Sequence, residues 1–199
     1  MITRLVAATF ALALISACAP LVSAPDARDA GMAQQSRQAE PDATAAAKYC
    51  ESTGGQVQRR IPVSGTDDSS LKHELVLAGS AQFCMYAKKG SRIYVLLGTL
   101  YATKPTLAAL AYYHAPKVPK SCSAGDPASC YCSYVGGSDR FNDVGVAEGA
   151  WVLEGAADVN LDACIFPDLS AIDSWGLTYH ADKVVAGIDL AKVLRYHPK

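Results

Sequence analysis

The stretch Tyr49-Cys50-Glu51-Ser52-Thr53-Gly54-Gly55 sets the architecture of this chain, because its outline returns in the second half. There, Tyr131-Cys132-Ser133-Tyr134-Val135-Gly136-Gly137 repeats the Tyr-Cys pair and the Gly-Gly pair at the same spacing. Internal similarity at a steady offset indicates a duplicated structural unit.

Three further pairs of motifs follow in the same order in both halves. They are Cys84-Met85-Tyr86 with Cys164-Ile165-Phe166, Leu97-Gly98 and Tyr101 with Trp175-Gly176 and Tyr179, and Thr106-Leu107-Ala108 up to Tyr113-His114 with Asp189-Leu190-Ala191 up to Tyr196-His197. This order favours a tandem duplication, with repeat unit 1 at 46–118 and repeat unit 2 at 119–199.

Each unit is expected to fold as a helix, a β-hairpin and a closing helix. A Gly-Gly pair tolerates the positive φ that ends the first helix, and Thr106 and Asp189 can cap the closing helices. In unit 1 we expect a helix over 45–50, then strands over 82–86 and 92–97 on either side of a turn at 88–91. In unit 2 we expect a helix over 127–132, then a strand over 163–166 before a turn at 167–170. The predicted fold class is α+β, a tandem duplication of a small disulfide-braced helix/β-hairpin/helix unit.

Six of the seven cysteines fall in the two units, and an even number suits an exported protein with disulfide bonds. Six cysteines allow fifteen pairings, and the sequence alone does not choose among them. If both units fold alike, the pairs are Cys50 with Cys84, Cys132 with Cys164, and Cys122 with Cys130.

The N-terminus predicts export. Residues 1–17 combine Arg4, an apolar run and small residues before a cysteine, as a secretory signal does. The run is shorter than the roughly 20 residues of a membrane-spanning helix. Ile15-Ser16-Ala17-Cys18 resembles the lipobox of bacterial lipoproteins, which implies that Cys18 becomes the first residue and carries diacylglycerol and palmitate. Ala19 resembles the residue that follows it in outer-membrane lipoproteins. The alternative is an ordinary signal cut nearby, which leaves a free thiol.

Residues 18–45 are expected to be the lipidated cysteine and a flexible tether, because Ala, Pro, Asp, Gln and Ser dominate there and little apolar surface is available for burial. A short helix through 32–40 is the alternative. The net charge of −1 and the pI near 6.4 offer no basic face, which argues against nucleic acid as a partner.

The repeated motifs resemble a small Cys-containing bacterial envelope domain of unknown function, found in lipoproteins and often labelled hemolysin. Its pattern is Pro-Ala-Ser, Tyr-Cys, Gly-Gly and later Cys-x-Phe-Pro-Asp-Gly-Ser-x-Cys-x-x-Trp. The second unit matches at Pro127-Ala128-Ser129, Tyr131-Cys132, Gly136-Gly137, Cys164, Phe166-Pro167-Asp168, Ser170 and Trp175. Leu169 stands in place of the family's Gly, and Ile172 in place of its later Cys. The resemblance implies a compact α+β envelope domain and supplies no catalytic residue.

Enzymatic and metal chemistry find little support. Export favours bonded rather than nucleophilic cysteines, and Cys130-x-Cys132 lacks the spacing of a thioredoxin motif. His114 and His197 would share a metal ion if the two ends faced each other. Each follows a Tyr at the end of a predicted helix, however, where a cation also complements the helix dipole. We therefore expect no enzyme, no metal and no cofactor. Lysis is not expected either, since no segment after the signal is apolar enough to span a bilayer.

Aromatic residues are the better functional signal, because a ring with a polar tip suits recognition. Most are expected in the core, Trp175 and Tyr131 above all, and the binding candidates are Tyr112, Tyr134 and Trp151. The predicted function is an outer-membrane-anchored periplasmic lipoprotein that binds an envelope protein or a cell-wall component such as peptidoglycan. The alternatives are an inhibitor of secreted proteases or lytic enzymes that presents the loop 123–129, and a hydrolase of unknown substrate.

Overall fold

The computed structural model describes residues 43–64, 75–123, 125–139, 149–154 and 160–199. All of them belong to one unit, Ala39–Lys199. The predicted signal peptide, Cys18 and most of the predicted tether lie outside the described residues.

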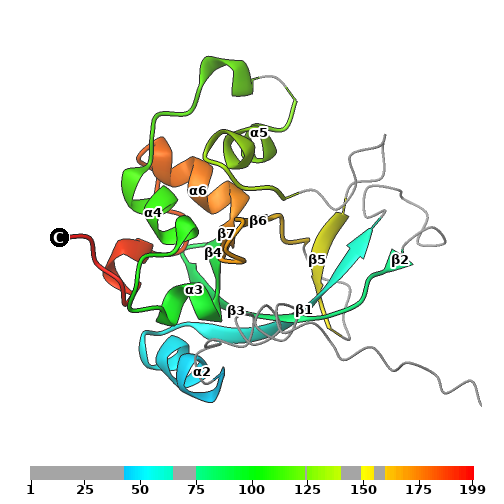
Figure 1. Cartoon of the computed structure of the whole chain (residues 1–199), viewed down its shortest axis with the longest axis vertical. Helices are drawn as coiled ribbons and strands as arrows, with labels where there is room; N and C mark the ends of the chain where they lie inside the picture. The colour runs from blue at the N-terminus through cyan, green and yellow to red at the C-terminus, as the bar shows by residue number, and fades with distance from the viewer. Residues whose placement is uncertain (1–42, 65–74, 124, 140–148, 155–159) are drawn as a thin grey trace, which may run out of the picture. The chain divides into compact units, whose positions relative to one another are not determined.

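Helices and one antiparallel sheet make up the described chain, so the α+β class is confirmed (Figure 1). The helices are α2 (Ala43–Ser52), α3 (Leu97–Tyr101), α4 (Leu107–His114), α5 (Pro127–Tyr134) and α6 (Ser174–Ala181), with 3-10 turns η2 (Lys120–Ser123) and η3 (Leu190–Lys192). The strands are β1 (Gln56–Ser64), β2 (Leu75–Val76), β3 (Ala81–Lys88), β4 (Ser91–Leu96), β5 (Gly149–Leu153), β6 (Ala163–Ile165) and β7 (Ala171–Asp173).

The sheet curls back on itself. Its strand order is β2-β1-β3-β4-β7-β6, and β5 pairs with β1 outside this path. Trp151 on β5 forms an antiparallel bridge with Leu161, just before β6, through two hydrogen bonds of 3.0 Å. This bridge joins the strand beside β1 to the chain that leads into β6, at the other end of the path. Because β4 pairs with β7 and β1 pairs with β5, strands from both predicted units, 46–118 and 119–199, share one sheet.

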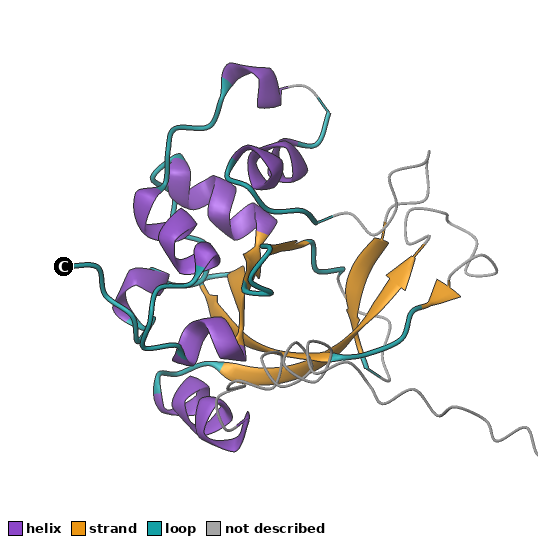
Figure 2. Cartoon of the chain, viewed as in Figure 1, coloured by secondary structure: helices purple, strands orange, loops and turns teal. Residues whose placement is uncertain are grey.

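Strand alternation divides the buried residues between the two faces of the sheet. The helices gather on one face (Figure 2) and pack against Cys84, Tyr86, Ile93, Val95, Cys164 and Ile172. The other face carries a smaller cluster around Phe83, Tyr94 and Leu161. Arg60 is fully buried, and its guanidinium lies 4.7 Å from the centre of the Tyr94 ring and donates to the Trp151 carbonyl at 2.9 Å.

The hairpins β3–β4 and β6–β7 are built alike. Cys84 pairs across the ladder with Val95, and Cys164 pairs with Ile172. Val95 and Ile172 also pair with each other, and theirs is the registered pair that joins β4 to β7. Matching residues therefore form one row across the four strands, with the two hairpins meeting at its centre.

The segments before these hairpins also correspond. Gly54 and Gly136 follow α2 and α5 with φ of 87° and 93°, as the Gly-Gly pairs predict. The chain then pairs with the neighbouring strand as Gln56 with Met85 and as Ser138 with Ile165, at equivalent positions. In the second half, the described residues show only this isolated bridge where the first half has the long strand β1.

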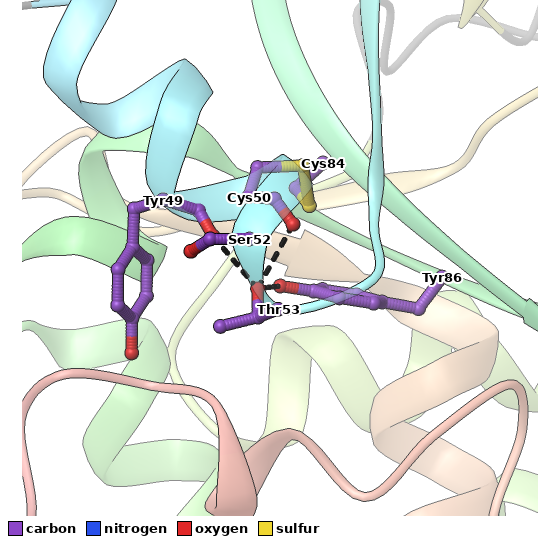
Figure 3. Close-up of a disulfide and its surroundings, with 6 residues drawn as sticks. All are labelled: Tyr49, Cys50, Ser52, Thr53, Cys84 and Tyr86. Carbon is purple, nitrogen blue, oxygen red and sulfur yellow. Dashed lines mark hydrogen bonds between the residues drawn. A yellow bond between two sulfur atoms is a disulfide. The ribbon is translucent and has the colours of Figure 1, made fainter.

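The three predicted disulfides are confirmed. Cys50–Cys84, Cys132–Cys164 and Cys122–Cys130 have Cα–Cα distances of 5.7, 5.5 and 5.4 Å. Figure 3 shows the first, which ties α2 to β3. The Thr53 hydroxyl lies 2.9 Å from the Tyr49 and Cys50 carbonyls and 2.6 Å from the Tyr86 hydroxyl. Thr53 has one proton to give to the carbonyls, so Tyr86 donates to Thr53, which fixes the end of α2 to the sheet.

The closing helices differ from each other. Thr106 caps α4 and Asp189 caps η3 as predicted, each through a side-chain oxygen that accepts a backbone N–H. The second element is a 3-10 turn of 3 residues, however, and the expected helix up to His197 is wrong. The chain after it is held instead by tertiary hydrogen bonds, such as that from the Arg195 N–H to the Leu100 carbonyl at 3.1 Å.

Leu169 in the β6–β7 turn predicts a stabilising substitution. Its φ is 63° and its side chain is 76% exposed, so it holds a left-handed backbone without much compensating burial. A non-glycine residue in this region costs about 1 kcal/mol, and Leu169→Gly should raise the free energy of unfolding by up to about 1 kcal/mol. Urea denaturation measures the change. Leu169→Ala keeps the Cβ, and an equal gain in that variant would contradict the explanation.

Candidate functional site: an apolar groove between the two halves

An apolar groove lies where the two halves of the chain meet, and its volume is about 760 Å³. Helix α4 and the segment after it come from the first half, while the end of α5 and the β6–β7 turn come from the second. The lining residues are Leu107, Leu110, Ala111, Tyr113, His114, Pro116, Tyr134, Val135, Gly136, Phe166, Pro167 and Pro198. None of these residues is an Asp, Glu, Lys or Arg.

Helix α4 exposes apolar residues because its sequence is apolar on every side. Ala108, Ala109 and Tyr112 face the core, which leaves Leu107 and Leu110 on the outer side, where Leu110 is 39% exposed. A helix that is hydrophobic all round is normally covered on all sides. Among the described residues, the outer face of α4 is therefore an apolar helix surface that no partner of matching chemistry covers.

The β6–β7 turn fixes α4 in this position. The Leu107 N–H donates to Asp168 Oδ2 at 2.8 Å, and the Ala108 N–H donates to Ser170 Oγ at 3.0 Å. Both are first-turn amides, which lack carbonyl partners inside the helix. One half of the chain thus caps a helix of the other and sets the width of the groove.

The C-terminal segment forms another part of the wall. The Tyr113 hydroxyl donates to the Tyr196 carbonyl at 2.9 Å and lies 3.1 Å from His197 Nδ1. These contacts hold the last residues against α4 and bring Pro198 to the groove.

Of the predicted binding residues, Tyr134 lies in the groove. It is the last residue of α5 and is 56% exposed. Tyr131, one turn earlier, is buried as expected and donates to the Pro116 carbonyl at 2.8 Å. Trp175, expected in the core, is instead partly exposed on α6.

Tyr112 and Trp151 lie elsewhere. Tyr112 is buried and stacks on His180 with ring centres 3.8 Å apart, and its hydroxyl accepts from the Leu190 N–H at 3.0 Å. As a core residue it presents no surface to a partner, which corrects the expectation for it. Trp151 is half-buried on β5 and packs edge-on against Phe83, with centres 5.6 Å apart. The structure does not bring the three candidates together.

In the segment 123–129, expected to be an inhibitor-like loop, the structure describes Ser123 and residues 125–129. Lys120–Ser123 form η2, and Pro127–Ser129 are the first turn of α5. Asp126 caps that turn by accepting from the Ala128 and Ser129 amides at 2.9 and 3.3 Å. Of the described residues of this segment, Ser123 and Pro127–Ser129 lie in helical turns rather than in the extended backbone on which the inhibitor interpretation depends.

Metal-ligating and membrane-spanning features were also considered in the sequence. In the described ranges, no three His, Cys, Asp or Glu side chains gather as metal ligands would. His114 lines the groove, while His197 contacts Tyr113. No helix within these same ranges is long and apolar enough to cross a bilayer.

Asp173 is a carboxyl group whose pKa departs far from its ordinary value. It ends β7 and caps α6, accepting from the Gly176 N–H at 3.1 Å. Burial raises its pKa to about 7, because loss of solvation outweighs the amides of Gly176, Trp175 and Tyr94, and Asp162 adds to the rise. A cap that holds backbone amides has a structural role.

Folding stability should therefore depend on pH through Asp173. The folded pKa exceeds the unfolded value of 3.8, so the stabilising contribution is complete below about pH 4 and is lost as pH rises through about 7. Asp173→Asn keeps the acceptor and removes the titration. Between pH 4 and 8 the wild type should lose on the order of 4 kcal/mol more than the variant. Urea unfolding at both pH values measures this, and parallel profiles would contradict it.

Comparisons with protein-family models, curated proteins and solved structures find no match to this chain. The groove and the cysteine framework are therefore the features that carry a functional proposal.

Proposed function

We propose that this protein is an exported lipoprotein, anchored to the outer membrane through acylated Cys18, whose folded part is a non-enzymatic binding module for another envelope protein. The observation that carries the proposal is the aromatic-lined groove beside α4, whose lining holds no Asp, Glu, Lys or Arg. The bonded cysteines support an oxidising compartment. Their even number leaves Cys18 for the lipid.

A tandem duplication accounts for where the groove lies. The matched hairpins, the equivalent disulfides and the paired centre at Val95 and Ile172 support descent of both halves from one unit. Where the two copies meet, an element that is present in one copy and shortened in the other makes their contact surfaces different. Here the first half has helix α4, and the second half has only the shorter 3-10 turn η3 at the equivalent position. The two halves therefore present different surfaces where they meet, and the groove lies there.

The chemistry of the groove favours an extended, apolar, proline-containing protein segment. Tyr113, Tyr134 and Phe166 supply ring surface, and Pro116, Pro167 and Pro198 supply rigid apolar edges. Aromatic-lined grooves bind polyproline-type segments, which are preformed and lose little entropy on docking. A glycan would bury hydroxyl groups against this lining without partners, at an unfavourable free energy.

Photo-crosslinking in living cells tests the proposal. A photoreactive phenylalanine derivative replaces Tyr134, which is exposed, in the full-length protein. We expect a protein adduct whose mapped peptide is apolar and contains proline. Leu110→Gln, which keeps a good helix former but removes an exposed apolar contact, should reduce the adduct at least about tenfold, which equals 1.4 kcal/mol of binding free energy.

Val185 provides the matched control, because it is exposed and does not line the groove. A photoreactive residue there should not give the same adduct, and Val185→Gln should not weaken the adduct at Tyr134. An adduct that lysozyme releases would identify a cell-wall glycan instead. That result, or an adduct that survives Leu110→Gln unchanged, would overturn the proposal.

A further inference from the structure

A second cleft, distinct from the groove in every lining residue, lies beside α6. Its volume is about 410 Å³, within the range of small-molecule sites. Strand β4 contributes Arg92, α6 contributes Trp175 and Tyr179, and the chain before β6 contributes Asn160 and Asp162.

The aromatic side chains form a ledge at this cleft. Trp175 and Tyr179 are four residues apart on α6 and so lie on one face of the helix. Their ring centres are 5.8 Å apart with an interplanar angle of 34°, and they are 37% and 42% exposed. Exposed rings held side by side offer an apolar surface that the C–H face of a sugar ring can cover.

The polar residues of the cleft supply the hydrogen-bond donors and acceptors that a sugar requires. Each sugar hydroxyl both donates and accepts hydrogen bonds. Asp162 accepts, Arg92 donates, and the Asn160 amide does both. Arg92 faces two carboxyl groups at this cleft, Asp162 and the buried Asp173, so the lining has no excess of positive charge to attract an anionic polysaccharide and favours an uncharged ligand.

We propose that this cleft binds an uncharged saccharide, with one sugar ring on the Trp175 and Tyr179 ledge and its hydroxyls toward Asn160, Asp162 and Arg92. The inference rests on the proposed envelope location, where cell-wall glycan is the available saccharide, but not on occupation of the groove. A module with both sites would hold an envelope protein and a glycan at the same time.

Titration of the purified full-length protein with β-1,4-linked N-acetylglucosamine tetrasaccharide tests the proposal, with cellotetraose and an oligouronate as further arms. We expect a Kd of about 1 mM, saturation transfer from aromatic protons to the sugar, and a change in tryptophan fluorescence. The protein has 2 tryptophans, so loss of the fluorescence change in Trp175→Phe would assign it. Tyr179→Ala should weaken binding at least tenfold, and Asn160→Ala should weaken it less.

Tyr134→Ala is the matched control, since it removes an exposed ring outside this cleft and should leave sugar binding unchanged. Preference for cellotetraose would still support an uncharged saccharide as the ligand, but would identify it as a glucan without N-acetyl groups. Absence of binding to both neutral oligosaccharides at about 10 mM, tighter binding of the oligouronate, or equal binding by Tyr179→Ala would overturn it. These outcomes leave the crosslinking result at Tyr134 untouched, so failure of one site is distinguishable from failure of the other.

Discussion

Gly55→Ala is expected to lower the free energy of unfolding by about 3 kcal/mol or more, a large share of the total for a single domain. A Cβ at this position would overlap Cys84 Sγ and lie 2.8 Å from Cys50 Sγ and 2.9 Å from Tyr86 Cε1. The disulfide and the buried ring are held by both α2 and the sheet, so neither can move aside cheaply. Gly55 is thus required by the close approach of its backbone to the bonded sulfurs.

Urea denaturation of Gly55→Ala and Gly98→Ala provides the comparison. At Gly98 in α3 a Cβ meets nothing within 4 Å, so alanine should be neutral or stabilise by up to about 1 kcal/mol. Gly137→Ala should behave like Gly55→Ala, because its Cβ would overlap Cys164 Sγ and lie 3.1 Å from Cys132 Sγ. If Gly55→Ala and Gly98→Ala proved equally stable, the packing argument would be wrong.

Removal of the Cys50–Cys84 disulfide should cost about 4 kcal/mol. The bond closes a loop with a sequence separation of 34, and the chain-entropy relation gives about 3.8 kcal/mol for such a loop. Both cysteines are fully buried, so the double substitution to alanine also removes packed sulfur atoms and adds to the cost. We expect the variant to be largely unfolded at 37 °C.

The small disulfide provides the internal control for this effect. Cys122–Cys130 has a sequence separation of 8, for which the same relation gives about 2.5 kcal/mol. Thermal unfolding of both double-alanine variants should therefore rank Cys50–Cys84 as the more damaging loss. The reverse ranking would show that local packing, rather than constraint of the unfolded chain, dominates.

The assumption that both repeated units fold alike predicted the cysteine pairing that the structure shows. The Tyr-Cys and Gly-Gly motifs at equal spacing placed each helix end next to a hairpin cysteine, and the second glycine of each pair is where the backbone passes the sulfurs. The caps at Thr106 and Asp189, one on α4 and the other on the 3-10 turn η3, followed from the preference of such residues for caps. These features depend on nearby residues, so the sequence predicts them well.

Other features depend on contacts between distant segments and were out of reach. No local sequence pattern predicts that β4 pairs with β7. Nor does one predict the bridge between β5 and the chain before β6, which accompanies the curl of the sheet. The interior Arg60 is equally unexpected, since arginine is rarely fully buried. The prediction of a closing helix in the second half was wrong because the backbone of Arg195 and Tyr196 is hydrogen-bonded to Leu100 and Tyr113 of the first half.

The candidate site was predicted in part. Tyr134 was singled out and lies in the groove, whereas Tyr112 is core and Trp175 is exposed, the reverse of what was expected for Trp175. Residue type did not distinguish them, because Tyr112 and Tyr113 are neighbours on α4 and the rotation of that helix decides which one is buried. The rotation is set by Asp168 and Ser170, whose capping contacts span the two halves.

Intact mass spectrometry of the protein extracted from native membranes tests the central claim most directly, with and without reduction before thiol alkylation. The account predicts a chain that begins at Cys18 and carries lipid, takes up no alkylating reagent before reduction, and takes up six equivalents afterwards. An unacylated chain, or one whose six other cysteines react without reduction, would contradict it.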